Sequence, residues 1–189
     1  MVGDRRTVGL VLAAGGGSRF GRPKILVDGW LSGAVRALTD GGCDDVLVVT
    51  GAARPMLPDG AGEVHCPGWS RGLGASLRAG LVAVGTDAER VVVHLVDCPD
   101  VDGRVVRRVL EKAGDRPVRA VYGGRPGHPA VIPRAHVGAL LDGLRDAEGA
   151  GPYLRAHALV VECGDLATGE DIDVDVLAPR RDRMEGSPS

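Results

Sequence analysis

Three runs of consecutive apolar residues stand out along the chain, at residues 7–13, 46–50 and 91–96. They are rich in valine and leucine and do not alternate with polar residues. Strands that are buried on both faces of a sheet have this pattern. Each run therefore predicts a central strand. Shorter runs predict three further strands, at residues 118–122, 130–132 and 158–162.

Between the strands, apolar residues recur at the three- and four-residue spacing of an amphipathic helix. This spacing predicts helices at residues 30–40, 72–84, 101–113 and 135–144. Strands that alternate with helices are typical of an α/β fold with parallel strands. We expect a single domain over residues 1–177. Residues 178–189, which end in Gly-Ser-Pro-Ser, are expected to form a mobile tail.

The composition suits one globular domain, because the 189 residues are 44% hydrophobic. The formal net charge of -2 gives no overall attraction to nucleic acid or to an anionic membrane. No apolar stretch approaches the roughly 20 residues that a membrane span requires. Residues 8–14 resemble a short signal-peptide core, but they lead into a glycine-rich segment and are interpreted as a strand. Four scattered cysteines without metal-ligand spacing predict reduced thiols in a cytoplasmic protein: Cys43, Cys66, Cys98 and Cys163.

The segment from Leu12 to Lys24 follows the first predicted strand and has the composition of a phosphate-binding loop. Its three consecutive glycines permit a tight turn in which backbone N–H groups point into a concave surface. Arg19 and Lys24 add positive charge, and a guanidinium group suits bidentate contact with phosphate. The alternative is a plain strand-to-helix turn with incidental charges. We therefore expect phosphate binding at the end of this strand.

Two familiar phosphate-binding motifs do not match this loop. Gly16 and Gly21 have the spacing of a Walker A motif, but Arg22 and Pro23 follow in place of Lys and Ser or Thr. A dinucleotide fingerprint would require a small residue at the position of Phe20. The loop is therefore not typical of a P-loop ATPase or of a dinucleotide-binding domain.

The loop resembles the signature segment of the nucleotidyltransferases related to molybdenum cofactor cytidylyltransferase. Three further segments follow in that family's order: Gly-Trp-Ser-Arg-Gly-Leu-Gly-Ala-Ser-Leu from residue 68, Val-Asp-Cys-Pro from residue 96, and Gly-His-Pro from residue 127. The resemblance covers roughly residues 7–177. It implies a three-layer α/β/α Rossmann-like fold with a mostly parallel sheet, of the nucleotide-diphospho-sugar transferase type.

The resemblance also implies roles for individual residues. It places Mg²⁺ on Asp97 and Asp173, and it makes Arg19, Lys24 and Asp97 the catalytic groups, with the two cations on the β- and γ-phosphates. The nucleotide would contact Leu12, Ala13, Ala14, Gly15, Gly16, Gly17, Ser18, Arg19, Lys24, Gly72 and Ser76. The acceptor would contact Trp69, Gly127 and His128.

The residues alone leave alternatives open for these positions. An Asp before Cys-Pro at the end of a strand, such as Asp97, also serves as a helix cap or turn residue. The acidic residues 170–175 also suit a solvated turn, and His128 also suits a structural position. Leu73 and Leu77 are also ordinary core residues of a helix.

The implied activity is Mg²⁺-dependent transfer of a nucleoside monophosphate to a small phosphorylated acceptor such as the molybdopterin cofactor, with release of pyrophosphate. The pair Ala13-Ala14 and the lack of an Asp before Lys24 favour CTP over GTP as the donor. The chain departs from the family pattern in three places: a shorter stretch after Lys24, Val96 before the metal Asp, and Val-Asp at residues 174–175. Two alternatives are an NAD(P)H-dependent oxidoreductase on the same scaffold and a nucleotide-binding module without catalysis.

Overall fold

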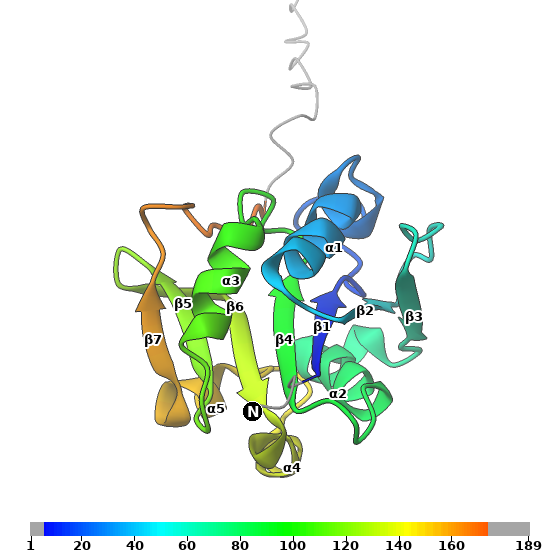
Figure 1. Cartoon of the computed structure of the whole chain (residues 1–189). Coiled ribbons are helices and arrows are strands. Elements are labelled where there is room, and N and C mark those ends of the chain that lie inside the picture. Colours follow the sequence, from blue (N-terminus) through cyan, green and yellow to red (C-terminus); the bar gives the residue numbers. More distant parts are fainter. Residues whose placement is uncertain (1–5, 174–189) are drawn as a thin grey trace, which may run out of the picture.

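A computed structural model describes residues 6–173 of the chain. Within them lies a seven-stranded sheet with the order β3-β2-β1-β4-β6-β5-β7 (Figure 1). The predicted tail at residues 178–189 and the Val-Asp pair at residues 174–175 lie outside the described residues. The strands are β1 (Thr7–Leu12), β2 (Asp45–Thr50), β3 (Ala61–His65), β4 (Arg90–Leu95), β5 (Val118–Tyr122), β6 (Arg125–Pro133) and β7 (Leu159–Glu162).

The sheet is mostly parallel, which confirms the expected fold class. Strand β1 pairs in parallel with β2 and β4, and β2 pairs in parallel with β3. Strand β6 is the exception, because it runs antiparallel to both of its neighbours, β4 and β5. Strand β7 completes the sheet by pairing in parallel with β5. The carboxyl ends of β1 and β4 therefore meet at one edge of the sheet.

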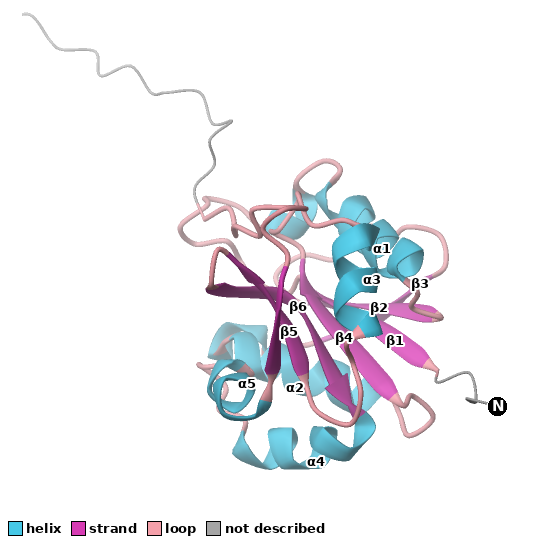
Figure 2. Ribbon diagram, turned by 60° about the vertical axis from the view of Figure 1, so that its left-hand side comes forward, coloured by secondary structure: helices cyan, strands magenta, loops and turns pink. Residues whose placement is uncertain are grey.

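Helices cover both faces of the sheet and complete the three layers (Figure 2). Helices α1 (Trp30–Gly41) and α3 (Gly103–Glu111) lie on one face. Helices α2 (Leu73–Ala83), α4 (Arg134–Gly143) and α5 (Gly151–His157) lie on the other. Two short 3₁₀ helices, η1 (Lys24–Leu26) and η2 (Trp69–Arg71), precede α1 and α2.

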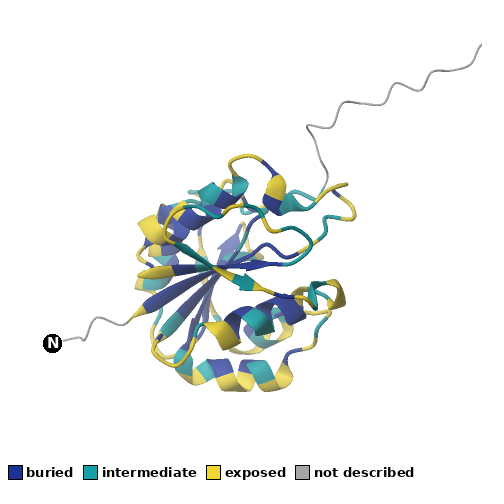
Figure 3. Cartoon of the chain, turned by 90° about the vertical axis from the view of Figure 1, so that its right-hand side faces the viewer, coloured by how far each residue is buried: buried dark blue, intermediate teal, exposed yellow. Residues whose placement is uncertain are grey.

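Each face of the sheet has its own hydrophobic core, and the central strands are buried between the two (Figure 3). All six residues of β1 are buried. On one face, Val11 and Val92 pack with residues of α1 and α3. On the other face, Leu10 and Val93 pack with residues of α2 and α4. Burial on both faces explains why β1 and β4 have continuous apolar sequences.

Helices α1 and α3 pack closely because glycines lie at their contact. A Cβ atom at Gly41, the last residue of α1, would overlap the side chain of Val106 on α3. A Cβ atom at Gly103 would lie 2.8 Å from the Cβ of Asp40. The small residues therefore set the separation of the two helices, and with it the position of the loop that enters α3.

Several boundaries differ from the sequence-based prediction. Helix α3 begins two residues later than predicted, because the Asp102 side chain accepts a hydrogen bond from the backbone N–H of Arg104 and caps the helix. Strand β6 is longer than predicted and includes the Gly-His-Pro sequence from residue 127. Strand β3 and helix α5 were not predicted. Among the described residues, no helix is both long and apolar enough to cross a membrane.

Candidate active site

A cavity of about 510 Å³ opens at the carboxyl ends of β1 and β4. Ligand sites in open α/β sheets form at this position, where connections leave neighbouring strands toward opposite faces. The loop after β1 provides one wall, and the start of α2 provides another. Every predicted nucleotide-binding residue lines the cavity: Leu12, Ala13, Ala14, Gly15, Gly16, Gly17, Ser18, Arg19, Lys24, Gly72 and Ser76.

The loop between β1 and η1 is held by backbone hydrogen bonds at its base and by a turn at its tip. The N–H of Ala13 donates to Val49, and the carbonyl of Ala14 accepts from Ala52. Gly17 has a φ of 63°, and a Cβ atom there would overlap the carbonyl oxygen of Arg22. Only glycine tolerates both conditions. The loop is therefore shaped by position 17, and its tip closes through the 2.7 Å bond from Gly21 N to Gly17 O.

The amino end of α2 faces the same cavity. Gly72, Leu73 and Ser76 line the cavity wall there, and Ser76 is 5% exposed. The N–H of Gly74 is bound by the carbonyl of Asp146 at 2.7 Å. The positive end of the helix dipole thus points toward the space that a phosphorylated ligand would occupy.

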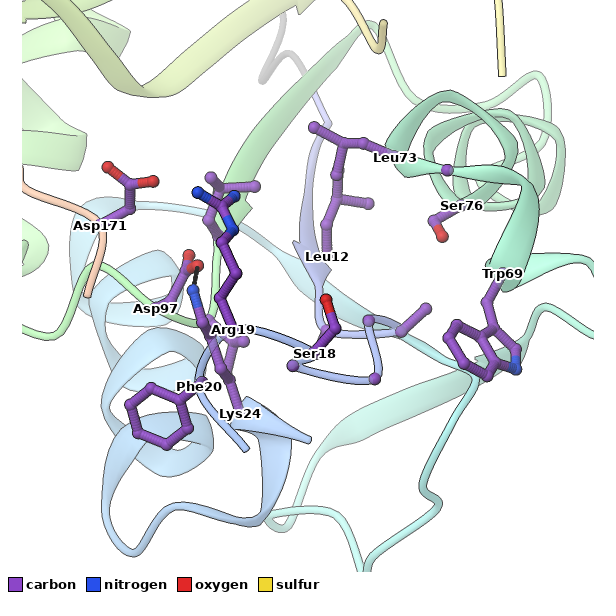
Figure 4. A pocket seen from close by; sticks show the side chains of 18 of the residues that line it. Leu12, Ser18, Arg19, Phe20, Lys24, Trp69, Leu73, Ser76, Asp97 and Asp171 are labelled. Atoms are coloured by element: carbon purple, nitrogen blue, oxygen red, sulfur yellow. Dashed lines mark hydrogen bonds and ion pairs between the residues drawn. The ribbon is translucent and has the colours of Figure 1, made fainter. Parts of the chain in front are cut away.

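Four charged side chains meet at one end of the cavity (Figure 4). The Nζ atom of Lys24 lies 2.7 Å from an oxygen of Asp97 and 3.0 Å from Oδ1 of Asp173. The other oxygen of Asp173 lies 2.8 Å from the guanidinium group of Arg19. The structure therefore brings together the four residues to which catalysis and metal binding were assigned from the sequence, although the chain separates Lys24 from Asp173 by 149 positions.

The contacts within this cluster keep Lys24 charged. Burial of its side chain, which is 15% exposed, lowers the pKa, but hydrogen bonds with Asp97 and Asp173 outweigh this effect. The pKa of Lys24 is consequently raised above its ordinary value. The hydrogen bond from Lys24 also lowers the pKa of Asp173. The cluster is thus a set of ionised groups in close contact.

A third carboxylate, not predicted from the sequence, also lies in this cluster. Oxygen atoms of Asp97, Asp171 and Asp173 all lie within 4.8 Å of one another. The i, i+2 spacing of Asp171 and Asp173 was the available signal, since alternate residues of an extended segment lie on the same side.

The segment that carries Asp171 is attached to the loop after β4. The N–H of Ile172 donates to the carbonyl of Asp97 at 3.0 Å. The Asp100 carboxylate accepts hydrogen bonds from the backbone N–H and the hydroxyl of Thr168, at 2.6 and 2.7 Å. These bonds hold the acidic residues over the carboxyl edge of the sheet.

The opposite end of the cavity is mainly apolar. Trp69, Leu73 and Ser76 lie there, away from Lys24 and Asp97 (Figure 4). The ring of Trp69 packs against Gly16 of the loop after β1. Trp69 was assigned to the acceptor from the sequence, but its place is at this end of the cavity. Gly127 and His128, assigned to the same role, lie on β6 and do not line the cavity.

The region around His128 holds two buried imidazoles. Burial and the nearby charge of Arg119 lower the pKa of His128 to about 4, and its carbonyl accepts a 2.6 Å bond from the Tyr122 hydroxyl. His94, on β4, is 0% exposed, and burial lowers its pKa to about 3. No group among residues 6–173 forms a hydrogen bond with either nitrogen of His94. Both side chains are therefore neutral at pH 7.

A second cavity of about 220 Å³ adjoins the charged end of the first. Tyr122, Arg125, Thr168 and Glu170 contribute to its lining, and Asp171 lines both cavities. Arg125 forms a 3.1 Å ion pair with Glu170 at its rim. The two cavities therefore meet at the acidic cluster.

Comparison with known proteins agrees with this arrangement. A family described as the MobA-like NTP transferase domain matches residues 9–160. Comparison with curated proteins gives no significant match.

Several solved structures are similar. Rv0371c from Mycobacterium tuberculosis H37Rv is 27% identical, with 89% of this chain and 93% of that chain covered and a TM-score of 0.75. A manganese complex of Rv0371c, aligned at 24% identity, covers 88% and 94% with a TM-score of 0.69. The 2-C-methyl-D-erythritol 4-phosphate cytidylyltransferase of Thermus thermophilus is 24% identical, covers 88% and 92%, and has a TM-score of 0.65.

Proposed function

Because the chain belongs to the family of MobA-like NTP transferase domains, and is therefore a nucleotidyltransferase, we propose that it transfers CMP from CTP to a small phosphorylated acceptor such as the molybdopterin cofactor. The division of the main cavity into a charged end and an apolar end carries this proposal. Lys24 and Arg19 lie at the charged end, and Leu73 and Trp69 lie at the apolar end. A nucleoside triphosphate has the same two-ended character.

The triphosphate would bind along the loop after β1. Within the described residues, the backbone N–H groups of Gly15, Gly16 and Ser18 donate to no backbone carbonyl. They are available to phosphate oxygens, and the amino end of α2 adds its dipole. Lys24 and Arg19 would neutralise the β- and γ-phosphates. The base would then lie toward Leu73, with the Ser76 hydroxyl as a polar contact.

The residues at the charged end fit a divalent cation. Asp97, Asp171 and Asp173 provide oxygen ligands, which Mg²⁺ and Mn²⁺ prefer. The contacts of Lys24 with Asp97 and Asp173 also support the proposal, because they show that these carboxylates accept a cation between them. A bound Mg²⁺ would supply charge neutralisation to the phosphates. Rv0371c, whose structure is similar, has been solved with manganese.

The reaction requires alignment and charge neutralisation from the protein, with no covalent intermediate on the chain. An oxygen of the acceptor phosphate forms a bond to the α-phosphorus of the nucleotide. The bond from that phosphorus to the oxygen leading to the β-phosphate breaks, and its electron pair leaves with pyrophosphate. Lys24 and Arg19 stabilise the negative charge that develops on this leaving group.

The acceptor would enter through the second cavity. Asp171 lines both cavities, so a ligand in the smaller one reaches the charged end of the larger one. Arg125 at its rim offers a guanidinium group to a phosphorylated acceptor. This placement differs from the assignment of Trp69, Gly127 and His128 to the acceptor.

Two measurements test the proposal. A thermal-shift screen compares CTP, GTP, ATP, UTP and NADPH in the presence of Mg²⁺. A ligand at 100 times its Kd adds about 2.7 kcal/mol, so the preferred nucleotide raises the Tm by several degrees. CTP is expected to give the largest rise. A shift with NADPH alone would support the oxidoreductase alternative.

Pyrophosphate release with CTP, Mg²⁺ and the molybdopterin cofactor is then measured for wild type and D97N. The variant is expected to lose at least about 100-fold in rate. D115N serves as the charge-matched control, because Asp115 is exposed and does not line the cavity. Undiminished release by D97N would show the proposed mechanism to be wrong.

A further inference from the structure

The two cations assigned to the triphosphate are bound, in the free protein, by the carboxylates assigned to the metal. Lys24 contacts one oxygen of Asp173 at 3.0 Å, and Arg19 contacts the other at 2.8 Å. Lys24 also contacts Asp97 at 2.7 Å. Both oxygens of Asp173 are therefore occupied by positively charged side chains. The same groups cannot serve the nucleotide and the metal site in this arrangement.

From these contacts we propose that Lys24 is an internal counter-cation that holds the metal site closed until a nucleoside triphosphate binds. The inference rests on the proposed function of the cavity. The triphosphate attracts Lys24 and Arg19 to its own oxygens, and their departure frees Asp97 and Asp173 for the divalent cation. Metal and nucleotide consequently bind with positive coupling, and each raises the affinity for the other.

Distances support the competition between Lys24 and a metal ion. A Mg²⁺ ion lies about 2.1 Å from a carboxylate oxygen. A metal on the Asp97 oxygen that contacts Lys24 would therefore lie no more than about 5 Å from the ammonium nitrogen. Two cations at that separation repel each other strongly in a partly buried site. Lys24 is held here as the charged form, since it is 15% exposed and paired with two carboxylates.

The test measures Mn²⁺ binding by electron paramagnetic resonance, with and without a non-hydrolysable CTP analogue. Wild type is expected to bind Mn²⁺ weakly alone and at least about 10-fold more tightly with the analogue, within the usual range of coupling. K24Q is expected to bind Mn²⁺ about 10-fold more tightly than wild type when no nucleotide is present. A loss of a lysine would thus improve metal binding.

Matched variants separate the position of the charge from its amount. K112Q removes the same charge from an exposed residue outside the cavity and should bind Mn²⁺ as wild type does. K24R keeps the charge and should keep the weak binding. If K24Q does not fold, R19Q provides the second variant, because the Arg19 side chain is 79% exposed. R19Q frees one oxygen of Asp173 and should raise the affinity for Mn²⁺ by a smaller factor.

The outcomes distinguish this inference from the proposed reaction. Equal Mn²⁺ affinity of wild type, K24Q and R19Q without nucleotide would overturn the role of Lys24 as a counter-cation. Pyrophosphate release that is normal in wild type would leave the proposed reaction intact in that case. Absence of Mn²⁺ binding in every protein, with or without nucleotide, would overturn both. Coupled binding without pyrophosphate release would support the inference and contradict the reaction.

Discussion

The indole of Trp69 packs directly on Gly16, so that a Cβ atom at position 16 would lie 3.1 Å from two carbons of the ring. Trp69 follows β3 and Gly16 follows β1, and the contact joins η2 to the phosphate-binding loop. The same tryptophan also lines the apolar end of the cavity. Trp69 is thus placed to support the loop from one side and to contact a bound nucleotide.

Replacement of Trp69 by alanine should weaken nucleotide binding. The loop loses its packing partner and the cavity loses one wall, so the KM for the nucleotide is expected to rise about 10-fold, or about 1.4 kcal/mol. The KM for the acceptor should stay constant, because Trp69 does not line the second cavity. Steady-state kinetics with each substrate varied in turn measures both values. A selective change in the acceptor KM would instead support the original assignment of Trp69.

Intrinsic fluorescence gives an independent readout of the same contact. The chain has two tryptophans, and the ring of Trp30 lies 5.5 Å from that of Phe20 on α1's side of the loop. Addition of nucleotide should change the emission of wild type and of W30F. W69F should retain nucleotide binding but lose most of the change in emission.

Replacement of Gly17 by alanine should destabilise the protein. The left-handed backbone at this position costs a residue with a side chain about 1–2 kcal/mol, and overlap with the Arg22 carbonyl adds to that cost. We expect a fall in Tm of about 4 °C or more. G15A is the control, since a Cβ atom there meets no atom within 4 Å. Equal Tm values for the two variants would contradict the described shape of the loop.

Two glycines of α1 should respond in opposite directions. G41A forces a methyl group into Val106 at the contact with α3, and overpacking of this kind costs about 1–3 kcal/mol. G33A meets no neighbouring atom and should add about 0.5–1 kcal/mol through helix propensity. Urea unfolding of both variants measures the free energy of unfolding. A stabilised G41A would show that the two helices are not in close contact.

Stability should fall in acid because of His94. Burial lowers the folded pKa of His94 to about 3, below the unfolded value of about 6.5. The contribution of the neutral ring is therefore fully present above pH 6.5 and is lost as the pH falls toward 3, at up to about 1.4 kcal/mol per pH unit. H94L should flatten this slope in urea unfolding between pH 4 and 6.5. H65Q, at an exposed position, should leave the slope as it is in wild type.

The parts of the fold that were predicted from the sequence are those with a strong local pattern. Strands β1, β2 and β4 are buried on both faces and are written in continuous apolar residues. Strand β3 lies at the edge of the sheet, where Ala61–His65 is only partly buried and mixes polar with small residues. The antiparallel direction of β6 depends on pairing with distant strands, which no local pattern specifies.

The candidate site shows the same division. The glycines and cations between Leu12 and Lys24 predicted a phosphate-binding loop, and the family match supports that interpretation. The contact of Lys24 with Asp97 and Asp173 is a tertiary relationship, and sequence spacing carries no information about it. Asp171 was passed over because a second exposed carboxylate beside Asp173 has the same sequence signature as a solvated turn.

The hydrogen bond from Ile172 to the Asp97 carbonyl joins two segments that are far apart in the order of synthesis. The sheet, the phosphate-binding loop and Asp97 all precede residue 163, whereas Asp171 and Asp173 are among the last described residues. A nascent chain still inside the ribosomal exit tunnel at this point can form the sheet but not the complete acidic cluster. Lys24 then has Asp97 as a partner, and its second partner arrives only when translation is nearly finished.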